Sequence, residues 1–280
     1  MSLLEETQLL AKRYRLRPDT DRGQNFLIDE TVVADSLRVG GIKPEDTVLE
    51  IGSGLGTLTT ALARRVARVV GIESDRRLFP LLDSLTEEYE NLTVIKNDFL
   101  KLEPAELYQA LALRQNQSYK VVANIPYYIT GKIISQLFSF EQLPTTIVLL
   151  VQKEVAEKIV AKAGDHSKQS LGVQFYGQAK VARIVSRKAF WPAPAVDSAL
   201  LVIEQLHHWN YQAPEEEVWQ LIRIGFSSRR KTLVNNLSAG LKLAKPEVEE
   251  WLLACKLSVK IRAQDLELSD WITLSVNKKL

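Results

Sequence analysis

The stretch Val48-Leu49-Glu50-Ile51-Gly52-Ser53-Gly54-Leu55-Gly56 decides the fold, because it places a glycine-rich turn between a strand and a helix expected to begin near Thr57. Glycines let the backbone take positive φ angles and let a ligand come close to the main chain. Three glycines within five positions carry a heavy entropic cost if the turn serves packing alone. The sequence therefore favours a cofactor loop over a tight turn without a ligand.

The spacing around this loop indicates which cofactor it holds. A dinucleotide fingerprint needs its third glycine where Thr57 stands, whereas here the third glycine is Gly56. This weakens the alternative of a nicotinamide oxidoreductase. Glu73 lies roughly 20 residues beyond the loop, at a strand end where a carboxylate accepts hydrogen bonds from ribose. Asp98 ends the following strand, where it either holds an adenine amino group or only caps the next turn.

Short β-branched runs alternate with helix-like stretches on both sides of the loop, which predicts parallel strands covered by helices. The first five runs are Thr47–Ile51, Val69–Glu73, Leu92–Lys96, Lys120–Asn124 and Thr146–Val151. Two more, Lys180–Val185 and Ala199–Ile203, are joined by the proline-containing stretch Trp191–Val196 and predict a closing antiparallel pair. We therefore expect an α/β, Rossmann-like sheet of seven strands, mostly parallel.

The pattern changes after Glu204, where a polar segment is followed by helical spacing without strands. Helices are expected over Glu215–Phe226, Arg229–Ser238 and Pro246–Cys255. The sequence thus predicts a sheet domain over residues 1–204, with a basic N-terminal segment over 1–25, and a small all-helical domain over 205–280.

Composition excludes several classes of protein. The longest aliphatic run, Ile147–Val151, is far shorter than the ~20 residues of a membrane span. The N-terminal segment has no apolar core followed by a cleavage site, so a secretory signal is not expected. The single cysteine, Cys255, and three histidines provide no plausible zinc set. We expect a cytoplasmic monomer with no membrane partner and no metal.

Basic residues gather in three places, although the net charge is only +2. The clusters are Lys12, Arg13, Arg15, Arg17 and Arg22; Arg187 and Lys188; and Arg229, Arg230 and Lys231. Any one cluster is compatible with an ordinary solvated face. Together they favour a surface that binds phosphates.

The string Asn124-Ile125-Pro126-Tyr127 follows the fourth expected strand and suits chemistry on an adenine. The amino nitrogen of adenine is a poor nucleophile until acceptors hold its hydrogens. The Asn124 oxygen and a carbonyl at Ile125 or Pro126 provide such acceptors, and the fixed φ of Pro126 helps to hold the carbonyl. Tyr127 offers a ring on which an extruded base stacks. The alternative is a plain turn after a strand.

The chain closely resembles the KsgA-type ribosomal RNA adenine dimethyltransferases, and the resemblance covers nearly its whole length. Three strings carry most of the resemblance: Gly23-Gln24-Asn25-Phe26-Leu27, Glu50 to Gly56 with Leu58-Thr59, and Asn124 to Tyr127. It continues through Gln152–Ala156, Phe190, Val196–Ala199 and Phe226–Leu233. The fold that this implies is the class I methyltransferase sheet with a helical domain that binds RNA.

The resemblance also implies a function and a site. It implies that S-adenosylmethionine is bound by Asn25, Leu27, Gly52, Gly54, Glu73, Asp98 and Asn124, and that the catalytic residues are Asn124, Pro126, Tyr127 and Phe190. Phe190 would face Tyr127 across the target base, whereas without the resemblance this residue is interpreted as a core aromatic. In this family two methyls are transferred to each of two adjacent adenosines near the end of small-subunit ribosomal RNA. The implied partners are that RNA and the assembling small ribosomal subunit.

The chain departs from the family pattern at one place, and two alternative functions stay open. Lys168–Val173 lacks the Tyr-Gly pair that usually precedes Leu-Ser-Val in this family, so we expect a loop there that grips RNA differently. One rival is the antibiotic-resistance branch, which methylates large-subunit RNA. The other is a non-catalytic assembly or transcription factor that kept the fold as an RNA-binding scaffold.

Overall fold

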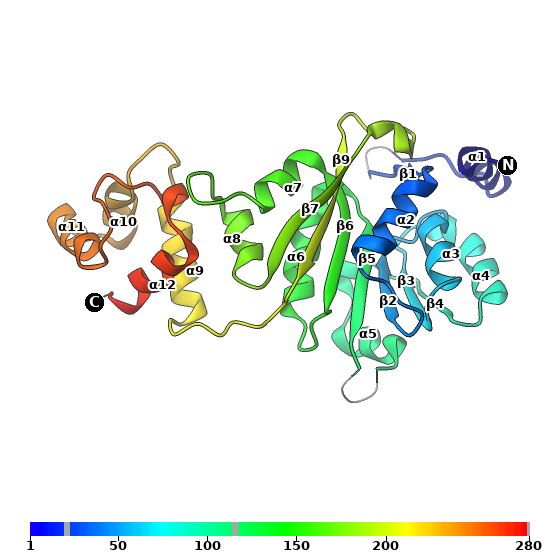
Figure 1. Cartoon of the computed structure of the whole chain (residues 1–280), viewed down its shortest axis with the longest axis horizontal. Helices are drawn as coiled ribbons and strands as arrows, with labels where there is room; N and C mark the ends of the chain where they lie inside the picture. Colours follow the sequence, from blue (N-terminus) through cyan, green and yellow to red (C-terminus); the bar gives the residue numbers. More distant parts are fainter. Residues whose placement is uncertain (20–22, 114–116, 279–280) are drawn as a thin grey trace. The chain divides into compact units, whose positions relative to one another are not determined.

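A mixed sheet with the strand order β4-β3-β2-β5-β6-β9-β7 forms the centre of the part that contains the glycine loop (Figure 1). Strands β2 to β6 are parallel, and β9 runs antiparallel to both of its neighbours, β6 and β7. The bounds are β2 Thr47–Ile51, β3 Arg68–Ile72, β4 Leu92–Ile95, β5 Tyr119–Asn124, β6 Thr146–Gln152, β7 Gln178–Val185 and β9 Ser198–Glu204. The predicted α/β fold class is confirmed, including the closing antiparallel pair.

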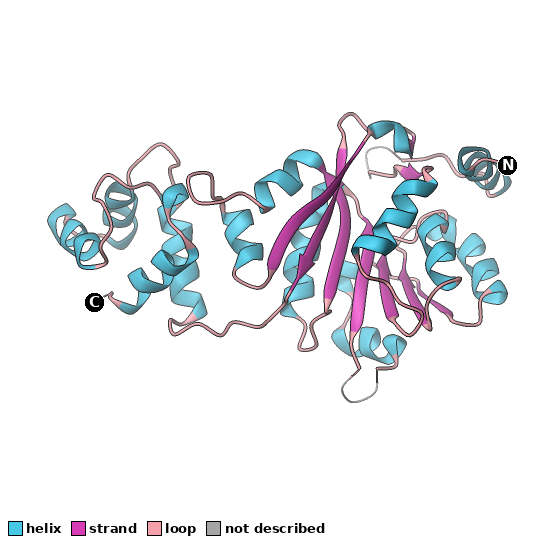
Figure 2. Cartoon of the chain, in the orientation of Figure 1, coloured by secondary structure: helices cyan, strands magenta, loops and turns pink. Residues whose placement is uncertain are grey.

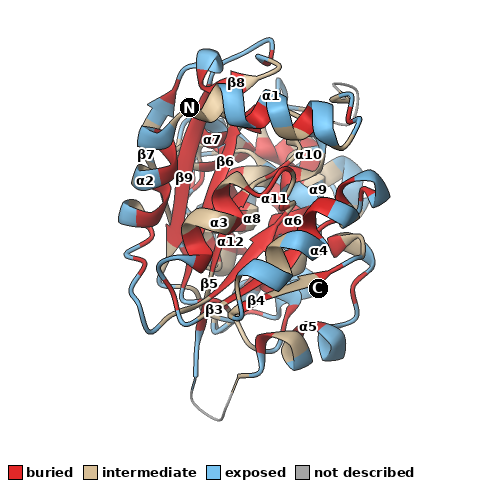
Figure 3. Cartoon of the chain, turned by 90° about the vertical axis from the view of Figure 1, so that its right-hand side faces the viewer, coloured by how far each residue is buried: buried red, intermediate tan, exposed pale blue. Residues whose placement is uncertain are grey.

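The central strands are apolar because both faces of the sheet are covered. Figure 2 shows helices on both sides of the magenta strands, and Figure 3 shows the central strands β5, β6 and β9 as largely buried. The helices of this part are α1 Leu3–Arg13, α2 Glu30–Val39, α3 Thr57–Ala63, α4 Phe79–Glu88, α5 Pro104–Leu111 and α6 Thr130–Ser139, followed by the first residues of α7 Lys153–Ile159. On one face, α2 and α3 share a hydrophobic cluster with alternate strand residues such as Val48, Val122 and Val148.

The computed structural model describes residues 1–19, 23–113 and 117–278. The chain divides into a sheet unit, Met1–Ala156 with Gln178–Leu206, and a helical unit, Glu157–Gly177 with His207–Leu280. The chain enters the helical unit for the second time after Leu206, close to the boundary expected after Glu204. Residues 157–177, by contrast, belong to the helical unit, although their pattern placed them in the sheet domain. In the part of the chain described, no helix is long and apolar enough to cross a membrane.

Aromatic packing explains why residues 157–177 join the helical unit. Phe175 is fully buried, and its ring contacts those of Trp209, Tyr211 and Trp219. The expected loop at Lys168–Val173 is wrong, because these residues form the helix α8, Lys168–Gln174, whose first turn is capped by Ser167. The other helices are α9 Glu215–Gly225, α10 Leu233–Leu241, α11 Lys245–Ala254 and α12 Leu268–Val276.

Trp271, on α12, lies at the centre of the helical core and is fully buried. Gly225 permits this packing, because a Cβ there would lie 2.6 Å from the Trp271 ring. We expect Trp271→Ala to lower the free energy of unfolding by about 3–5 kcal/mol, as loss of a buried aromatic ring leaves a cavity. Chemical denaturation followed by circular dichroism measures this. Leu253→Ala is the control, since Leu253 is 61% exposed, and an equal loss in both variants would contradict the assignment.

A second, two-stranded sheet was not predicted. In it β1, Phe26–Leu27, pairs antiparallel with β8, Phe190–Trp191, so that Leu27 lies opposite Phe190. Strands of two residues carry no periodicity that a sequence pattern can reveal. The pairing brings the N-terminal motif and the segment around Phe190 side by side.

Candidate active site

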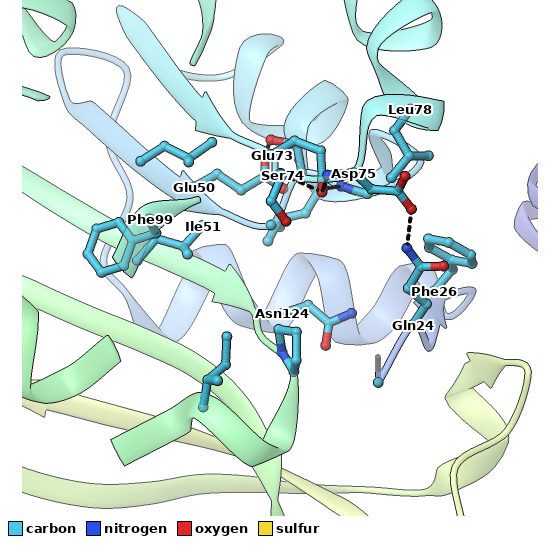
Figure 4. A pocket seen from close by; sticks show the side chains of 18 of the residues that line it. Gln24, Phe26, Glu50, Ile51, Glu73, Ser74, Asp75, Leu78, Phe99 and Asn124 are labelled. Atoms are coloured by element: carbon cyan, nitrogen blue, oxygen red, sulfur yellow. Dashed lines mark hydrogen bonds between the residues drawn. The ribbon is translucent and has the colours of Figure 1, made fainter. Parts of the chain in front are cut away.

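A cavity of about 370 Å³ opens in the sheet unit at the carboxyl ends of β2 to β5 (Figure 4). β2 lies between β3 and β5, so the connections on its two sides leave in opposite directions and open a crevice there. Eight predicted site residues line this cavity: Asn25, Leu27, Gly52, Gly54, Glu73, Asp98, Asn124 and Pro126. Tyr127 and Phe190 are not among the residues lining it. The volume is in the range of small-molecule sites.

The glycine loop needs its glycines for backbone conformation. Gly52, Gly54 and Gly56 have φ angles of +80°, +56° and +81°, where a side chain is strained. At Gly56 a Cβ would also lie 2.5 Å from a methyl group of Leu85 on α4. The loop ends where α3 begins at Thr57, as the sequence predicted.

The Glu73 carboxylate is held by three backbone N–H groups. Its Oε2 accepts from Gly54 at 2.9 Å, and its Oε1 accepts from Ser74 and Asp75 at 2.8 Å each. Burial raises the pKa of Glu73, and the three N–H donors oppose that rise. The side chain is thereby fixed against the loop, and Oε2, which accepts one N–H group, keeps a lone pair for a further donor from a ligand.

Asp98 caps the next turn, which is one of the two roles that the sequence left open, and its contact with an adenine amino group stays a prediction. Its Oδ1 accepts from the backbone N–H of Leu100 at 3.0 Å and caps the short turn Phe99–Lys101. The residue also lines the cavity, beside Asn97 and Phe99.

Glu50 lines the cavity as well, although the sequence analysis gave it no role of its own. It is 1% exposed, and its Oε2 accepts from the hydroxyls of Ser53 and Thr59. Burial raises its pKa to about 8. The sequence could have indicated this residue, because Glu50 directly precedes the glycine turn in the stretch Val48–Gly56.

The raised pKa of Glu50 predicts how stability depends on pH. The folded protein binds this proton more tightly than the unfolded chain, whose ordinary value is 4.5. The contribution of protonated Glu50 to the free energy of unfolding is therefore fully present below pH 4.5. It is lost as the pH rises through about 8. Urea titrations across this window are expected to show a shallower decline in the free energy of unfolding for Glu50→Gln than for the wild type. Identical slopes would contradict this, and Glu45→Gln, at an exposed position, is the control.

Asn124 ends β5, and a defined hydrogen bond orients its amide. The Nδ2 donates to the backbone carbonyl of Asn25 at 3.0 Å, and within the described residues the Oδ1 accepts no hydrogen bond. Pro126 follows with a φ of −58°, and its carbonyl accepts from the N–H of Ile129 at 3.3 Å. Asn124 therefore presents a fixed oxygen acceptor on a residue that lines the cavity.

The two aromatic residues of the predicted catalytic set, Tyr127 and Phe190, differ in how far they are buried. Tyr127 is partly buried, its hydroxyl lies 2.7 Å from the Ser198 hydroxyl, and burial raises its pKa. Phe190 is 2% exposed and packs in the hydrophobic cluster with Leu27. Tyr128, which the sequence analysis did not single out, lines the cavity and is 69% exposed. The stacking roles of Tyr127 and Phe190 stay predictions.

The basic clusters are exposed wherever the structure describes them. In the sheet unit these are Lys12, Arg13, Arg15 and Arg17 near α1, and Arg187 and Lys188 before β8. In the helical unit, Arg229, Arg230 and Lys231 precede α10. Arg22 lies outside the described residues. Over the described ranges, no group of three or more acidic, histidine or cysteine side chains is placed to hold a metal ion.

Comparison with known proteins identifies the family. The family model described as "Ribosomal RNA adenine dimethylase" matches residues 16–277. The ribosomal RNA small subunit methyltransferase A of Dehalococcoides mccartyi is 38% identical over 275 residues, covering 96% of this chain and 91% of the relative. The protein of the same name from Geobacillus kaustophilus is 37% identical, with 96% and 94% covered.

Solved structures agree with this. The dimethyladenosine transferase of Plasmodium falciparum matches with a TM-score of 0.71 and 27% identity, covering 89% of this chain and 95% of the other. The 23S rRNA methyltransferase ErmE matches with a TM-score of 0.70 at 24% identity, which shows a shared fold. The family match spans both units, and this chain is a member of the ribosomal RNA adenine dimethylase family.

Proposed function

We propose that this protein transfers methyl groups from S-adenosylmethionine to the exocyclic amino groups of two adjacent adenosines near the end of small-subunit ribosomal RNA. The product is dimethyladenosine, formed in the cytoplasm late in the assembly of the small subunit. One observation carries the proposal: the oriented amide of Asn124 lines the same cavity as Glu73 and the glycine loop. The names of the curated relatives support the choice of the small subunit.

The lining of the cavity suits S-adenosylmethionine, the methyl donor of this family. Glu73 is fixed where its oxygens can accept from ribose hydroxyls, and Asp98 stands where it can accept from the adenine amino group. Asn25 and Leu27, from the N-terminal motif, line the same cavity, and we assign them to the methionine end of the cofactor. Gly52 and Gly54 leave room for the ligand along the main chain.

The chemistry requires that the adenine nitrogen direct its lone pair at the methyl group. The Asn124 oxygen and a carbonyl at Ile125 or Pro126 accept the two amino hydrogens, which lets the nitrogen become pyramidal. Bound S-adenosylmethionine would supply the methyl group, and its sulfur would keep the electron pair of the carbon–sulfur bond that breaks as the nitrogen–carbon bond forms. The methylated nitrogen is then strongly acidic and loses a proton to water. Positioning and dipole alignment supply the rate, so no general base is needed.

The target base has to leave its stack to reach this site. Tyr127 offers it a ring, and the contact with Ser198 restrains that ring. We also propose Phe190 on the opposite side of the base. Since Phe190 is buried here, its contact with a base requires that β8 open when RNA binds.

The exposed basic clusters are the proposed contacts to RNA phosphates, with the helical unit as the RNA-binding domain and a monomer as the active form. We expect affinity for RNA to fall steeply between ~50 and ~200 mM salt, because phosphate contacts release counterions. Filter binding over a salt series measures the slope. Arg229→Gln combined with Lys231→Gln reduces the slope if these residues contact phosphates, and a flat response in the wild type would contradict the proposal.

The substrate is tested by giving the protein labelled S-adenosylmethionine together with under-methylated small and large ribosomal subunits. We expect label on two adjacent adenosines of small-subunit RNA, located by primer extension. Label confined to the large subunit would replace the proposed substrate with that of the antibiotic-resistance branch.

A further inference from the structure

The N-terminal motif forms a short segment across the cavity. We call residues 23–27 the strap, and all five of them line the cavity. Its C-terminal half is firmly attached: Phe26 and Leu27 are buried and pair with β8, and the N–H of Ile28 donates to the Ala189 carbonyl at 2.8 Å. This half is part of the core of the sheet unit and is expected to stay in place when the cofactor binds in the absence of RNA.

In the N-terminal half of the strap, the Gln24 side chain makes hydrogen bonds to three residues. Gln24 Nε2 donates to Asp75 Oδ2 at 2.7 Å, a bond drawn as a dashed line in Figure 4. Gln24 Oε1 accepts from Arg77 at 3.2 Å and from the N–H of Asp19 at 2.8 Å. Arg77 in turn donates to both carboxylate oxygens of Asp75. We call Gln24, Asp75 and Arg77 the latch.

The latch joins the side of the cavity proposed for ribose to the side proposed for chemistry. Asp75 stands two residues after Glu73, in the loop that follows β3. At the other side, the Asn25 carbonyl accepts from Asn124, and a Cβ on Gly23 would lie 3.2 Å from that of Pro126. Releasing Gln24 from Asp75 thus removes the direct bond between the strap and the loop after β3, while the contacts of the strap with the turn at Asn124 remain.

The bonds of the latch are of a strong kind. Arg77 beside Asp75 holds the pKa of that carboxyl down at about 2, so the carboxylate is ionised at neutral pH. Hydrogen bonds to an ionised acceptor are roughly twice as strong as those between neutral groups. The Asp75 side chain is 8% exposed, which limits screening by water, whereas Arg77 is 44% exposed.

We propose that Gln24, Asp75 and Arg77 form a latch that holds the strap over the bound cofactor and so sets its affinity and residence time. These are positioning residues, since they act through the strap and take no part in methyl transfer. The inference rests on the proposed function, because it takes S-adenosylmethionine as the occupant of the cavity.

The test is the affinity for S-adenosylmethionine and for its product S-adenosylhomocysteine, measured by calorimetry on the full chain. We expect Asp75→Ala and Gln24→Ala each to weaken binding by about ten- to a hundredfold, the range for losing a hydrogen bond to a charged group. In turnover assays, KM for the cofactor is expected to rise by a similar factor, with kcat at saturating cofactor within about twofold of the wild type. Arg76→Ala is the control, an exposed arginine of the same short turn.

A double-mutant cycle separates the latch from a general loss of structure. If both residues act through one bond, the double variant Gln24→Ala with Asp75→Ala binds S-adenosylmethionine no more weakly than whichever single variant has the lower affinity. Affinities equal to the wild type, or a fall in kcat with unchanged KM, would overturn the latch. If Asp75→Ala does not fold, Gln24→Ala and Arg77→Gln decide the question. If the wild type itself binds no S-adenosylmethionine, the proposed function fails instead.

Discussion

Replacing Asn124 with alanine is expected to reduce methyl transfer by at least about a hundredfold, the scale seen when one preorganised polar partner of a reacting group is removed. The variant removes the oxygen that would accept an adenine amino hydrogen, and it also removes the bond from Nδ2 to the Asn25 carbonyl. The comparison uses single-turnover rates at saturating RNA and cofactor. RNA affinity is expected to stay near that of the wild type, because the exposed basic residues lie elsewhere in the sequence.

The control for this prediction is Asn277→Ala. Asn277 caps the end of α12, and its amide donates to the Thr273 carbonyl at 2.9 Å. Its loss should leave the rate of methyl transfer unchanged. If Asn124→Ala turned over at the rate of the wild type, the catalytic assignment would be lost, and a scaffold role for the fold would regain support.

Glu73→Gln is expected to weaken the binding of S-adenosylmethionine by about a hundredfold. The carboxylate accepts three backbone N–H groups, whereas an amide presents an NH₂ group to at least one of them. The glycine loop at Gly54 and the proposed ribose contact are then disturbed together. Calorimetric titration measures the change in dissociation constant.

Glu87→Gln is the matched control for Glu73→Gln. Glu87 is an exposed carboxylate on α4, and it is not among the residues lining the cavity. Cofactor affinity in this variant should equal that of the wild type. A Glu73→Gln protein that binds the cofactor as tightly as wild type would remove Glu73 from the proposed site.

Much of the fold was predictable because its signals are local. Both ends of the strand Thr47–Ile51 were predicted correctly, and the glycines after it predicted the turn before Thr57. Helix α12 was not predicted, and α10 begins at Leu233, four residues later than expected, because Thr232 caps it. Long-range packing was also missed: tertiary contacts, among them those of Phe175 with distant aromatic rings, place residues 157–177 in the helical unit.

The same distinction applies to the site. Residues that end parallel strands, such as Glu73, Asp98 and Asn124, were predicted because strand ends meet at one edge of a sheet. Gln24 and Asp75 were missed as a pair, since they stand 51 positions apart and meet only through tertiary structure. The burial of Phe190 depends on the pairing of β8 with β1, which no periodicity shows.

The central claim is that the turn after β5 presents acceptors to an adenine amino group at the cavity that holds the methyl donor. The most direct measurement is mass spectrometry of the nucleosides from under-methylated small subunits after reaction with the protein and S-adenosylmethionine. We predict dimethyladenosine with the wild type and unmodified adenosine with Asn124→Ala. A wild-type reaction that leaves adenosine unmodified, or that places the methyl groups on another base, would contradict the claim.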